Sequence, residues 1–272
     1  MTSSATKIFG IVNVTPDSFS DGGSFPDSAS AVGYALRLVA DGADLIDVGG
    51  ESTRPGAERV PAAVERERVL PVVAALADRS IPVSIDTMNA STARAALDVG
   101  AVVINDVSGG RADDAMAGVV AESGVPYVTM HWRSPSSEMH RHAEYADAPR
   151  DVRNELKQRI AELVVAGVQP EQIILDPGLG FAKEGSHNWQ LLARLGELQT
   201  LGYPLLIGAS RKRFLQQLSH QATDTPESRD LPTAVISALV SATGAWAVRV
   251  HDVRSTRVAL DVIEAWKGGL RR

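Results

Sequence analysis

The chain has 272 residues, a formal charge of −6 at pH 7 and no cysteine. The acidic balance argues against a general affinity for nucleic acid or an anionic membrane, so any phosphate site must be a local cluster of cations. The lack of cysteine excludes disulfides, thiolate zinc sites, iron–sulfur clusters and cysteine nucleophiles. The length is near the roughly 250 residues of one barrel domain, and no linker divides the chain. We therefore expect one domain over residues 1–272.

The N-terminal stretch is short and polar, which does not suggest a signal peptide. No apolar run approaches the roughly 18–20 residues needed to cross a bilayer. We expect a soluble, cytoplasmic protein that binds neither nucleic acid nor membrane.

The chain contains eight short apolar runs, and most of them are followed directly by a polar side chain. Runs of this kind, bounded by Gly, Pro and polar residues, read as buried parallel strands. In chain order they are 8–12 before Asn13, 45–46 before Asp47, 83–85 before Asp86, 102–104 before Asn105, 127–130 before His131, 173–175 before Asp176, 205–207 before Gly208, and 247–250, which contains Arg249 and precedes His251.

Helical patterns lie between these runs. We expect helices at 28–41, 65–79, 90–99, 113–123, 150–166, 189–200 and 254–267, and a split helix over 211–219 and 233–243. The alternation predicts an α/β protein with a single-domain (β/α)8 TIM barrel. In that fold the active site lies at the C-terminal ends of the strands, where the polar side chains occur.

Two polar loops follow the first two strands. In the loop at 13–23, Asn13 and carboxylates such as Asp21 are hard oxygen ligands suited to Mg²⁺ beside a phosphate. Its length favours a lid, although its composition also suits an ordinary turn. The loop at 49–56 places Thr53 beside Arg54, which can bind a phosphate or carboxylate through two parallel hydrogen bonds. Surface charges on a turn are the alternative there.

Asp86, Asn105 and Asp176 occupy equivalent ends of three strands. If they converge, they form a ring of acceptors with one amide that both donates and accepts. This pattern suits a flat heterocycle bearing N–H donors and a carbonyl. Any one of the carboxylates might instead cap the following helix. Met130 is expected to form the floor of the pocket.

Positive side chains gather near the last two strands. The run Ser210-Arg211-Lys212-Arg213 lies at an expected helix start, where an anionic ligand explains the cations better than a surface role. Arg249 and His251 are two residues apart, so they share one face of a strand. Together with Lys212 they make a diphosphate clamp. A structural role for His251 is the alternative.

Seven motifs, spread from the first strand to the last helix, resemble the dihydropteroate synthase family. They are NVTPDSFSDGG at 13–23, DVGGESTRPG at 47–56, SIDT at 84–87, NDVSGG at 105–110, DPGLGF at 176–181, GASRKRF at 208–214 and RVHDV at 249–253. The resemblance implies a transferase of folate biosynthesis. It would condense 6-hydroxymethyl-7,8-dihydropterin diphosphate with 4-aminobenzoate, giving 7,8-dihydropteroate and diphosphate.

The resemblance also implies roles for individual residues. The pterin and its diphosphate would contact Thr53, Asp86, Asn105, Met130, Asp176, Gly208, Lys212, Arg249 and His251. The 4-aminobenzoate would contact Thr53, Arg54, Pro55, Phe181 and Ser210. Asn13 would help to bind Mg²⁺, and the residues expected to take part in catalysis are Lys212, Arg249, His251 and Asp21. Sulfonamides would compete with the amine, and the chain would form a homodimer through helices near the end of the barrel.

Two other functions are compatible with such motifs. A pterin-binding methyltransferase domain of the same architecture would bind a folate and would not need the diphosphate clamp. A catalytically silent paralogue would bind a pterin or a partner protein without turnover.

Overall fold

The structure is a computed structural model that describes residues 5–15, 28–52, 59–134, 142–218 and 225–270. It contains eight parallel strands in one sheet. They are β1 (Lys7–Asn13), β2 (Leu45–Gly49), β3 (Val83–Asp86), β4 (Val103–Asp106), β5 (Tyr127–Met130), β6 (Ile173–Asp176), β7 (Leu206–Ile207) and β8 (Ala247–Val250). All eight expected strands are therefore present, and the expected TIM barrel is confirmed.

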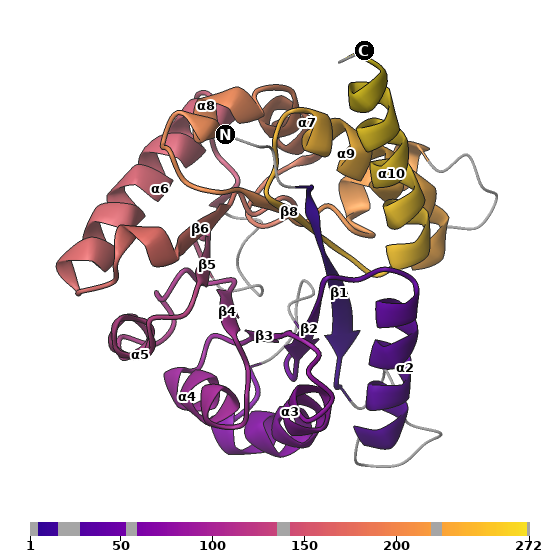
Figure 1. Ribbon diagram of the computed structural model, residues 1–272. Helices are drawn as coiled ribbons and strands as arrows, with labels where there is room; N and C mark the ends of the chain where they lie inside the picture. The colour runs from indigo at the N-terminus through magenta and orange to yellow at the C-terminus, as the bar shows by residue number, and fades with distance from the viewer. Residues whose placement is uncertain (1–4, 16–27, 53–58, 135–141, 219–224, 271–272) are drawn as a thin grey trace.

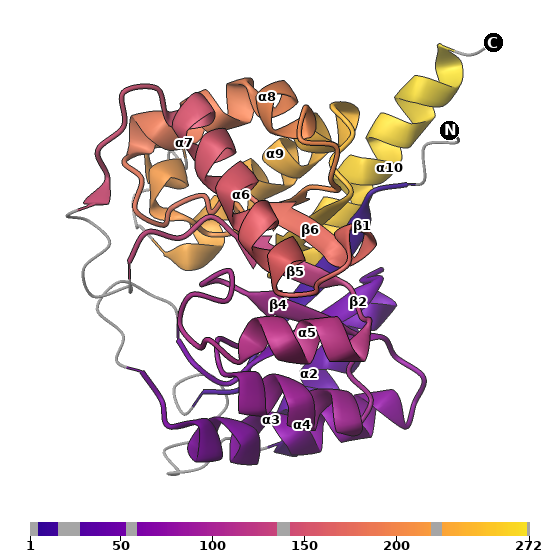
Figure 2. The same ribbon diagram turned by 90° about the vertical axis from the view of Figure 1, so that its left-hand side faces the viewer.

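The helices alternate with the strands and surround them (Figure 1). The α-helices are α2 (Ser28–Ala40), α3 (Ala62–Ala77), α4 (Ala90–Asp98), α5 (Met116–Ser123), α6 (Ala148–Val165), α7 (Gly185–Ala193), α8 (Leu195–Gln199), α9 (Asp230–Ala242) and α10 (Val253–Gly269). Short 3₁₀ helices among the described residues include η2 (Pro170–Gln172), η3 (Arg213–Leu218) and η4 (Pro226–Arg229). Figures 1 and 2 show α3 to α6 following one another around the outside of the strands.

Two of the expected helices differ from the structure. The helix expected over 189–200 is two helices, because Arg194 leaves the helical region with φ −121° and ψ 31°. The first half of the split helix, expected over 211–219, is wrong as an α-helix. Arg211 has a left-handed backbone with φ 57°, and only the short 3₁₀ helix η3 follows.

The barrel closes between its sixth and seventh strands. Along the sheet the order is β6-β5-β4-β3-β2-β1-β8-β7. A parallel bridge pairs Leu175 with Leu205, and the Leu175 amide donates to the Pro204 carbonyl at 2.9 Å. Because all the strands run parallel around a closed cylinder, their C-terminal ends lie at the same rim.

The inside of the barrel is apolar at one end and polar at the other. A buried cluster of alternate strand residues fills the N-terminal end, where Trp246 packs beneath it: Phe9, Leu45, Val103, Val128, Ile174, Leu206 and Ala247. Side chains two positions further along a strand point the same way. The next inward positions on β2, β4, β6 and β8 are Asp47, Asn105, Asp176 and Arg249. Because inward positions recur every two residues, the inward side chains nearer the C-terminal rim on these strands are polar.

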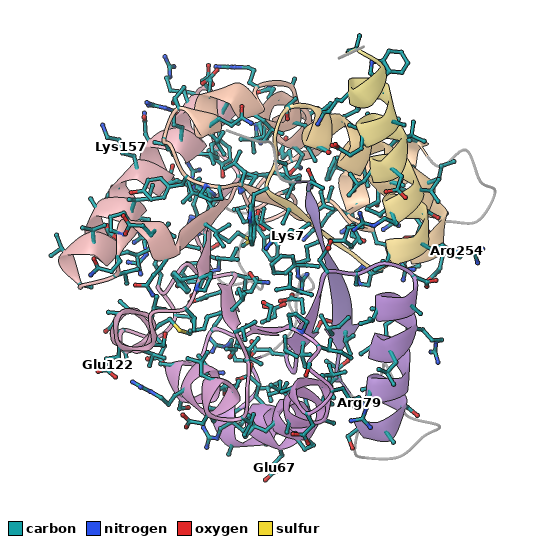
Figure 3. The ribbon with its side chains drawn as sticks, viewed as in Figure 1. Lys7, Glu67, Arg79, Glu122, Lys157 and Arg254 are labelled. Atoms are coloured by element: carbon teal, nitrogen blue, oxygen red, sulfur yellow. The ribbon has the colours of Figure 1, made fainter. Side chains whose placement is uncertain are left out.

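The outer surface of the barrel supplies the main core. Branched apolar residues that face outward from the strands pack under the helices, among them Ile8, Ile46, Ile85, Ile104, Ile173 and Val248. Figure 3 shows the opposite distribution for charge, with Glu67, Arg79, Glu122, Lys157 and Arg254 at the outer edge of the molecule. In the part of the chain that the structure describes, no helix combines the length and the apolar character needed to cross a membrane.

Candidate active site

Arg249 forms the centre of the polar rim. Its Nε lies 2.5 Å from Oδ2 of Asp47, and its Nη2 lies 2.6 Å from Oδ2 of Asp86. The amide of Asn105 donates to the same Asp47 oxygen at 3.1 Å. Asp47 is fully buried and Asp86 is 8% exposed, so both carboxylates need this cation as a partner. Residues from β2, β3, β4 and β8 therefore meet around one guanidinium.

Burial and neighbouring charge act in opposite directions on this cluster. Burial raises the pKa of Asp86, whereas the charge of Arg249 lowers it and Asp47 raises it again. Burial lowers the pKa of Arg249, but the carboxylates of Asp47 and Asp86 outweigh burial and raise that pKa above its usual value. We infer that Arg249 stays positively charged and that Asp47 and Asp86 share its single charge.

Asp176 lies at the rim on β6, two strands from Arg249 around the barrel. Its Oδ1 accepts a hydrogen bond of 2.7 Å from the amide of Gly178, two residues on. Burial raises the pKa of Asp176, and the charges of Lys212, Lys183 and Arg249 oppose that rise. A Cβ at Gly208 would lie 3.6 Å from Oδ2 of Asp176, so the glycine keeps the space beside this carboxylate open.

Lys212 joins Asp176 to the Arg249 cluster. Burial and, to a lesser extent, the charge of Arg249 lower the pKa of Lys212 to about 8, against the opposing carboxylates of Asp176 and Asp86. Its Nζ lies 4.0 Å from the centre of the Phe181 ring, a distance typical of a cation–π contact. Lys212 thus lies among acceptors, with an aromatic wall beside it.

The remaining expected residues of the described chain line the same rim. The hydroxyl of Ser210 lies 2.9 Å from Nδ1 of His251 and accepts from the His251 amide at 3.0 Å. Met130 is buried in a small apolar cluster with Val107, Phe181 and Ala182. Asn13 is the partly exposed last residue of β1. The expected site residues Asp21, Thr53, Arg54 and Pro55 lie outside the described residues.

A ring of acceptors, an amide and buried cations at a barrel rim suits a polar heterocycle carrying an anionic group. Comparison with known proteins points the same way. Residues 9–251 match the family model described as pterin binding enzyme. Dihydropteroate synthase of Mycobacterium leprae is 53% identical over 270 residues, which cover 98% of this chain and 95% of that protein. The chain belongs to the dihydropteroate synthase family.

Solved structures of that family share the whole fold. Xanthomonas albilineans dihydropteroate synthase with 4-aminobenzoic acid has a TM-score of 0.90 and 41% identity, over 98% of this chain and 95% of that one. The same enzyme in complex with 7,8-dihydropteroate has a TM-score of 0.86 and 39% identity, over 98% and 95%. These relatives are synthases, which favours the expected transferase over a methyltransferase or a silent paralogue.

Sequence reasoning assigned no role to two buried residues of the site. Asp47 follows an apolar run just as Asp86 does, and this position is the signal that identifies it. Lys183 lies beyond the motif at 176–181 and is only 8% exposed. No spacing rule marks Lys183, because its contact with His131 spans 52 positions and its contacts with Gly178 and Phe181 depend on how the turn after β6 folds.

The expectation for Arg211 is wrong. No anionic ligand is needed to explain this arginine, because its Nε and Nη2 each lie 2.8 Å from Asp230, and its Nη1 lies 3.1 Å from Glu227. Acidic side chains of the same chain therefore neutralise this arginine, and the positive charge aimed at the rim comes from Lys212 and Arg249.

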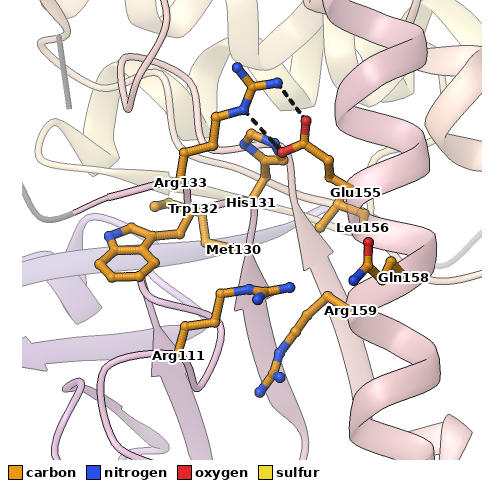
Figure 4. Close-up of a pocket in the computed structure, with 9 residues that line it drawn as sticks. All are labelled: Arg111, Met130, His131, Trp132, Arg133, Glu155, Leu156, Gln158 and Arg159. Carbon is orange, nitrogen blue, oxygen red and sulfur yellow. Dashed lines mark hydrogen bonds and ion pairs between the residues drawn. The ribbon is translucent and has the colours of Figure 1, made fainter. Parts of the chain in front are cut away.

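A cavity of about 440 Å³ lies beside the end of β5 and the face of α6 (Figure 4). Its arginines are already paired, Arg133 with Glu155 and both Arg111 and Arg159 with Glu162. It shares Met130 with the rim but none of the carboxylates around Arg249. We therefore place the candidate active site at the rim and not in this cavity.

Proposed function

We propose that this chain condenses 6-hydroxymethyl-7,8-dihydropterin diphosphate with 4-aminobenzoate, releasing 7,8-dihydropteroate and diphosphate in folate biosynthesis. The observation that carries the proposal is the gathering of Asp86, Asn105, Asp176 and Lys212 around Arg249 in a barrel of the synthase family. The relatives named above support the same reaction, because the Xanthomonas albilineans enzyme has been solved both with 4-aminobenzoic acid and with 7,8-dihydropteroate.

The pterin ring occupies the polar rim. Asp86 and Asp176 accept its N–H groups, and the Asn105 amide both donates and accepts. Met130 packs against the face of the ring, and Gly208 leaves room beside Asp176. A ligand with the wrong pattern of donors would leave buried carboxylates without partners, which is the physical basis of selectivity here.

The diphosphate lies toward Lys212, Arg249 and His251, and the family resemblance adds Thr53, which lies outside the described residues. These groups stabilise the negative charge that builds up on the leaving diphosphate. The carbon that is attacked is conjugated to the pterin ring, so positive charge developing there spreads into the ring and an ionising path is favoured. The amine of 4-aminobenzoate is nucleophilic without prior deprotonation. Catalysis then depends on alignment of the amine and on departure of the diphosphate.

The 4-aminobenzoate lies against Phe181 and Ser210, and the family resemblance adds Thr53, Arg54 and Pro55, which lie outside the described residues. The guanidinium of Arg54 suits the carboxylate of the acid. A sulfonamide that resembles 4-aminobenzoate competes for the same surface. Exclusion of water from the site would protect the cationic intermediate from capture. The sequence-based expectation that Asp21 and the first two loops take part falls on residues outside the described ones.

The donors at the rim fit a Mg²⁺ ion that binds together with the diphosphate. Across the described ranges, no group of three or more His, Cys, Asp or Glu side chains is arranged to hold a metal. Mg²⁺ commonly takes one or two protein oxygens and completes its shell with water and substrate phosphates. The side-chain oxygen of Asn13 suits this role, and the ion supplies charge neutralisation for the diphosphate. Asn13→Leu is expected to raise the Mg²⁺ concentration needed for half-maximal activity.

A direct assay tests the proposed reaction. Purified protein is mixed with the dihydropterin diphosphate, 4-aminobenzoate and Mg²⁺, and diphosphate release is followed. Calorimetry with the pterin substrate alone separates binding from turnover. Folded protein that binds the pterin but releases diphosphate no faster than a protein-free control would overturn the proposal.

We propose that the chain forms a homodimer through α9 and α10, which pack side by side. Apolar side chains four residues apart are exposed on each helix: Leu231, Val235 and Leu239 on α9, and Val258, Val262 and Trp266 on α10, with Leu270 directly after its end. A self-complementary apolar face of this kind suits a two-fold interface. Leu239→Glu should produce monomers in sedimentation analysis, whereas Leu36→Glu on α2 should not. Wild-type protein that sediments as a monomer would refute the proposal.

A cytoplasmic location stays a prediction.

A further inference from the structure

Lys183 lies beneath the turn that follows β6. Its Nζ lies 3.0 Å from the carbonyl oxygen of Gly178, 3.0 Å from the carbonyl oxygen of Phe181 and 3.0 Å from Nδ1 of His131. Burial lowers the pKa of Lys183 to about 7, and the charge of Asp176 opposes that shift. In its protonated form the lysine has three donors, and these contacts use all three. Lys183 therefore holds the protein itself and has no donor left for a substrate.

His131 links Lys183 to α6. Its Nε2 lies 2.9 Å from Glu155, whose carboxylate also accepts from Nε of Arg133 at 3.0 Å (Figure 4). Burial, together with the charge of Lys183, lowers the pKa of His131 to about 4, so the ring is neutral at neutral pH. Nδ1 then accepts from Lys183 while the proton on Nε2 is donated to Glu155. The two contacts select one tautomer and orient the ring.

The turn held by Lys183 contains an unfavourable backbone. Ala182 has φ 46°, in the left-handed region that residues with a Cβ rarely adopt. The two carbonyls that flank its Cα are both anchored. Phe181 O accepts from Lys183, and Ala182 O accepts from the Tyr145 hydroxyl at 2.9 Å. Unfavourable backbone persists only where the surroundings enforce it, and these two side chains do so.

The same turn carries two residues of the candidate active site. In this turn, residues 178–182, the amide of Gly178 donates to Asp176, and the ring of Phe181 contacts Lys212. We propose that Lys183 and His131 are positioning residues, which touch neither substrate and set Asp176 and Phe181 for binding. The kinetic test of this inference rests on the proposed function, because it measures synthase activity.

The kinetic test uses Lys183→Met, which keeps the aliphatic chain and removes the three donors. We expect KM for both substrates to rise about fivefold or more while kcat changes less than about twofold, because binding geometry is lost and the chemistry is kept. A purely structural defect lowers the active fraction, and therefore kcat, without changing KM. Unchanged KM values would overturn the inference.

Gln172→Leu is the matched control. The Nε2 of Gln172 also bridges two backbone carbonyls, those of Val120 and Val125, at 2.8 and 2.9 Å. Gln172 immediately precedes β6 at the opposite end of that strand from the turn. This variant loses comparable buried hydrogen bonds, and its KM values are expected to match those of the wild type.

Hydrogen exchange gives a readout that does not depend on turnover. In Lys183→Met the amides of residues 178–183 should exchange about tenfold faster or more, because the turn opens locally. In Gln172→Leu they should exchange at the wild-type rate. If the wild type shows no synthase activity but the exchange rates differ in this way, the proposed function fails and the role of Lys183 in holding the turn stands. If the wild type is active and exchange is unchanged in Lys183→Met, the inference fails alone.

A second substitution tests how Lys183 acts. Glycine adopts positive φ without the steric cost of a Cβ, so Ala182→Gly should recover about half or more of the KM loss of Lys183→Met. No recovery would show that Lys183 does not act by holding the backbone. If Lys183→Met does not fold, Lys183→Gln keeps two donors and should show the same direction of change, smaller by about twofold or more; wild-type KM values in that variant would also overturn the inference.

Discussion

Arg249 on the last strand donates a hydrogen bond of 2.6 Å to Asp86 on the third strand, across 163 positions of sequence. Its other contact, to Asp47, spans 202 positions. The cation therefore ties the two ends of the chain together at the rim where the substrates are expected to bind. One side chain thus serves both the closure of the barrel and the proposed reaction.

Removing this cation should destabilise the protein. Arg249→Leu leaves two buried carboxylates without their partner, and the free energy of unfolding in urea should fall by about 3–5 kcal/mol. Arg94→Ala breaks an exposed pair with Glu122 and should cost less than about 1 kcal/mol. Asp47→Asn combined with Arg249→Leu should recover part of the loss. Equal losses in Arg249→Leu and Arg94→Ala would contradict the role of Arg249 in closing the barrel.

Lys212 should control the rate of synthesis and its dependence on pH. Lys212→Ala is expected to lower turnover about tenfold or more, because the charge beside the leaving diphosphate is lost. The pKa of this lysine is about 8, so kcat/KM of the wild type should fall as the pH rises through that value and the ammonium loses its proton. Lys212→Arg keeps its charge and should not show that fall. Lys157→Ala, on the exposed face of α6, is the control and should match the wild type.

His131 should make the protein less stable in mild acid. Its pKa in the folded protein is about 4, below the usual 6.5. Between these two values the histidine is protonated in the unfolded chain and neutral in the folded chain. The stabilisation is complete above pH 6.5 and is lost as the pH falls toward 4, by about 3 kcal/mol in all. Urea unfolding at several pH values measures this loss, and His131→Gln should show a smaller one. Parallel curves for the two proteins would rule out His131 as the cause.

Two glycines should respond in opposite ways to alanine. Gly178 has φ 68°, and a Cβ there would lie 2.5 Å from the carbonyl oxygen of His131. Gly178→Ala should therefore lower the free energy of unfolding by about 2 kcal/mol or more. Gly118, inside α5, has no atom within 4 Å of the added Cβ, so Gly118→Ala should raise it by about 0.5–1 kcal/mol. Thermal or urea unfolding compares them, and a stable Gly178→Ala would show that the turn tolerates a side chain.

Local patterns were sufficient to predict the strands and the residues at their ends. The runs before Asp86, Asn105 and Asp176 end where the structure ends β3, β4 and β6, within one or two residues. Helix ends were predicted less well. The break at Arg194 and the left-handed backbone at Arg211 depend on packing and on the pairing of Arg211 with Asp230, which no local pattern contains.

The sequence by itself determined the (β/α)8 order and the rim that carries the chemistry, because strand periodicity and the parallel arrangement place alternate side chains inside and strand ends together. Only the tertiary structure decided that Arg249 joins Asp47 to Asp86, that Arg211 is neutralised within the chain, and that Lys183 supports the turn at Phe181. Each of these is a contact between residues distant in sequence or set by a left-handed backbone. Such contacts exist only once the barrel has closed and the buried charges must find partners.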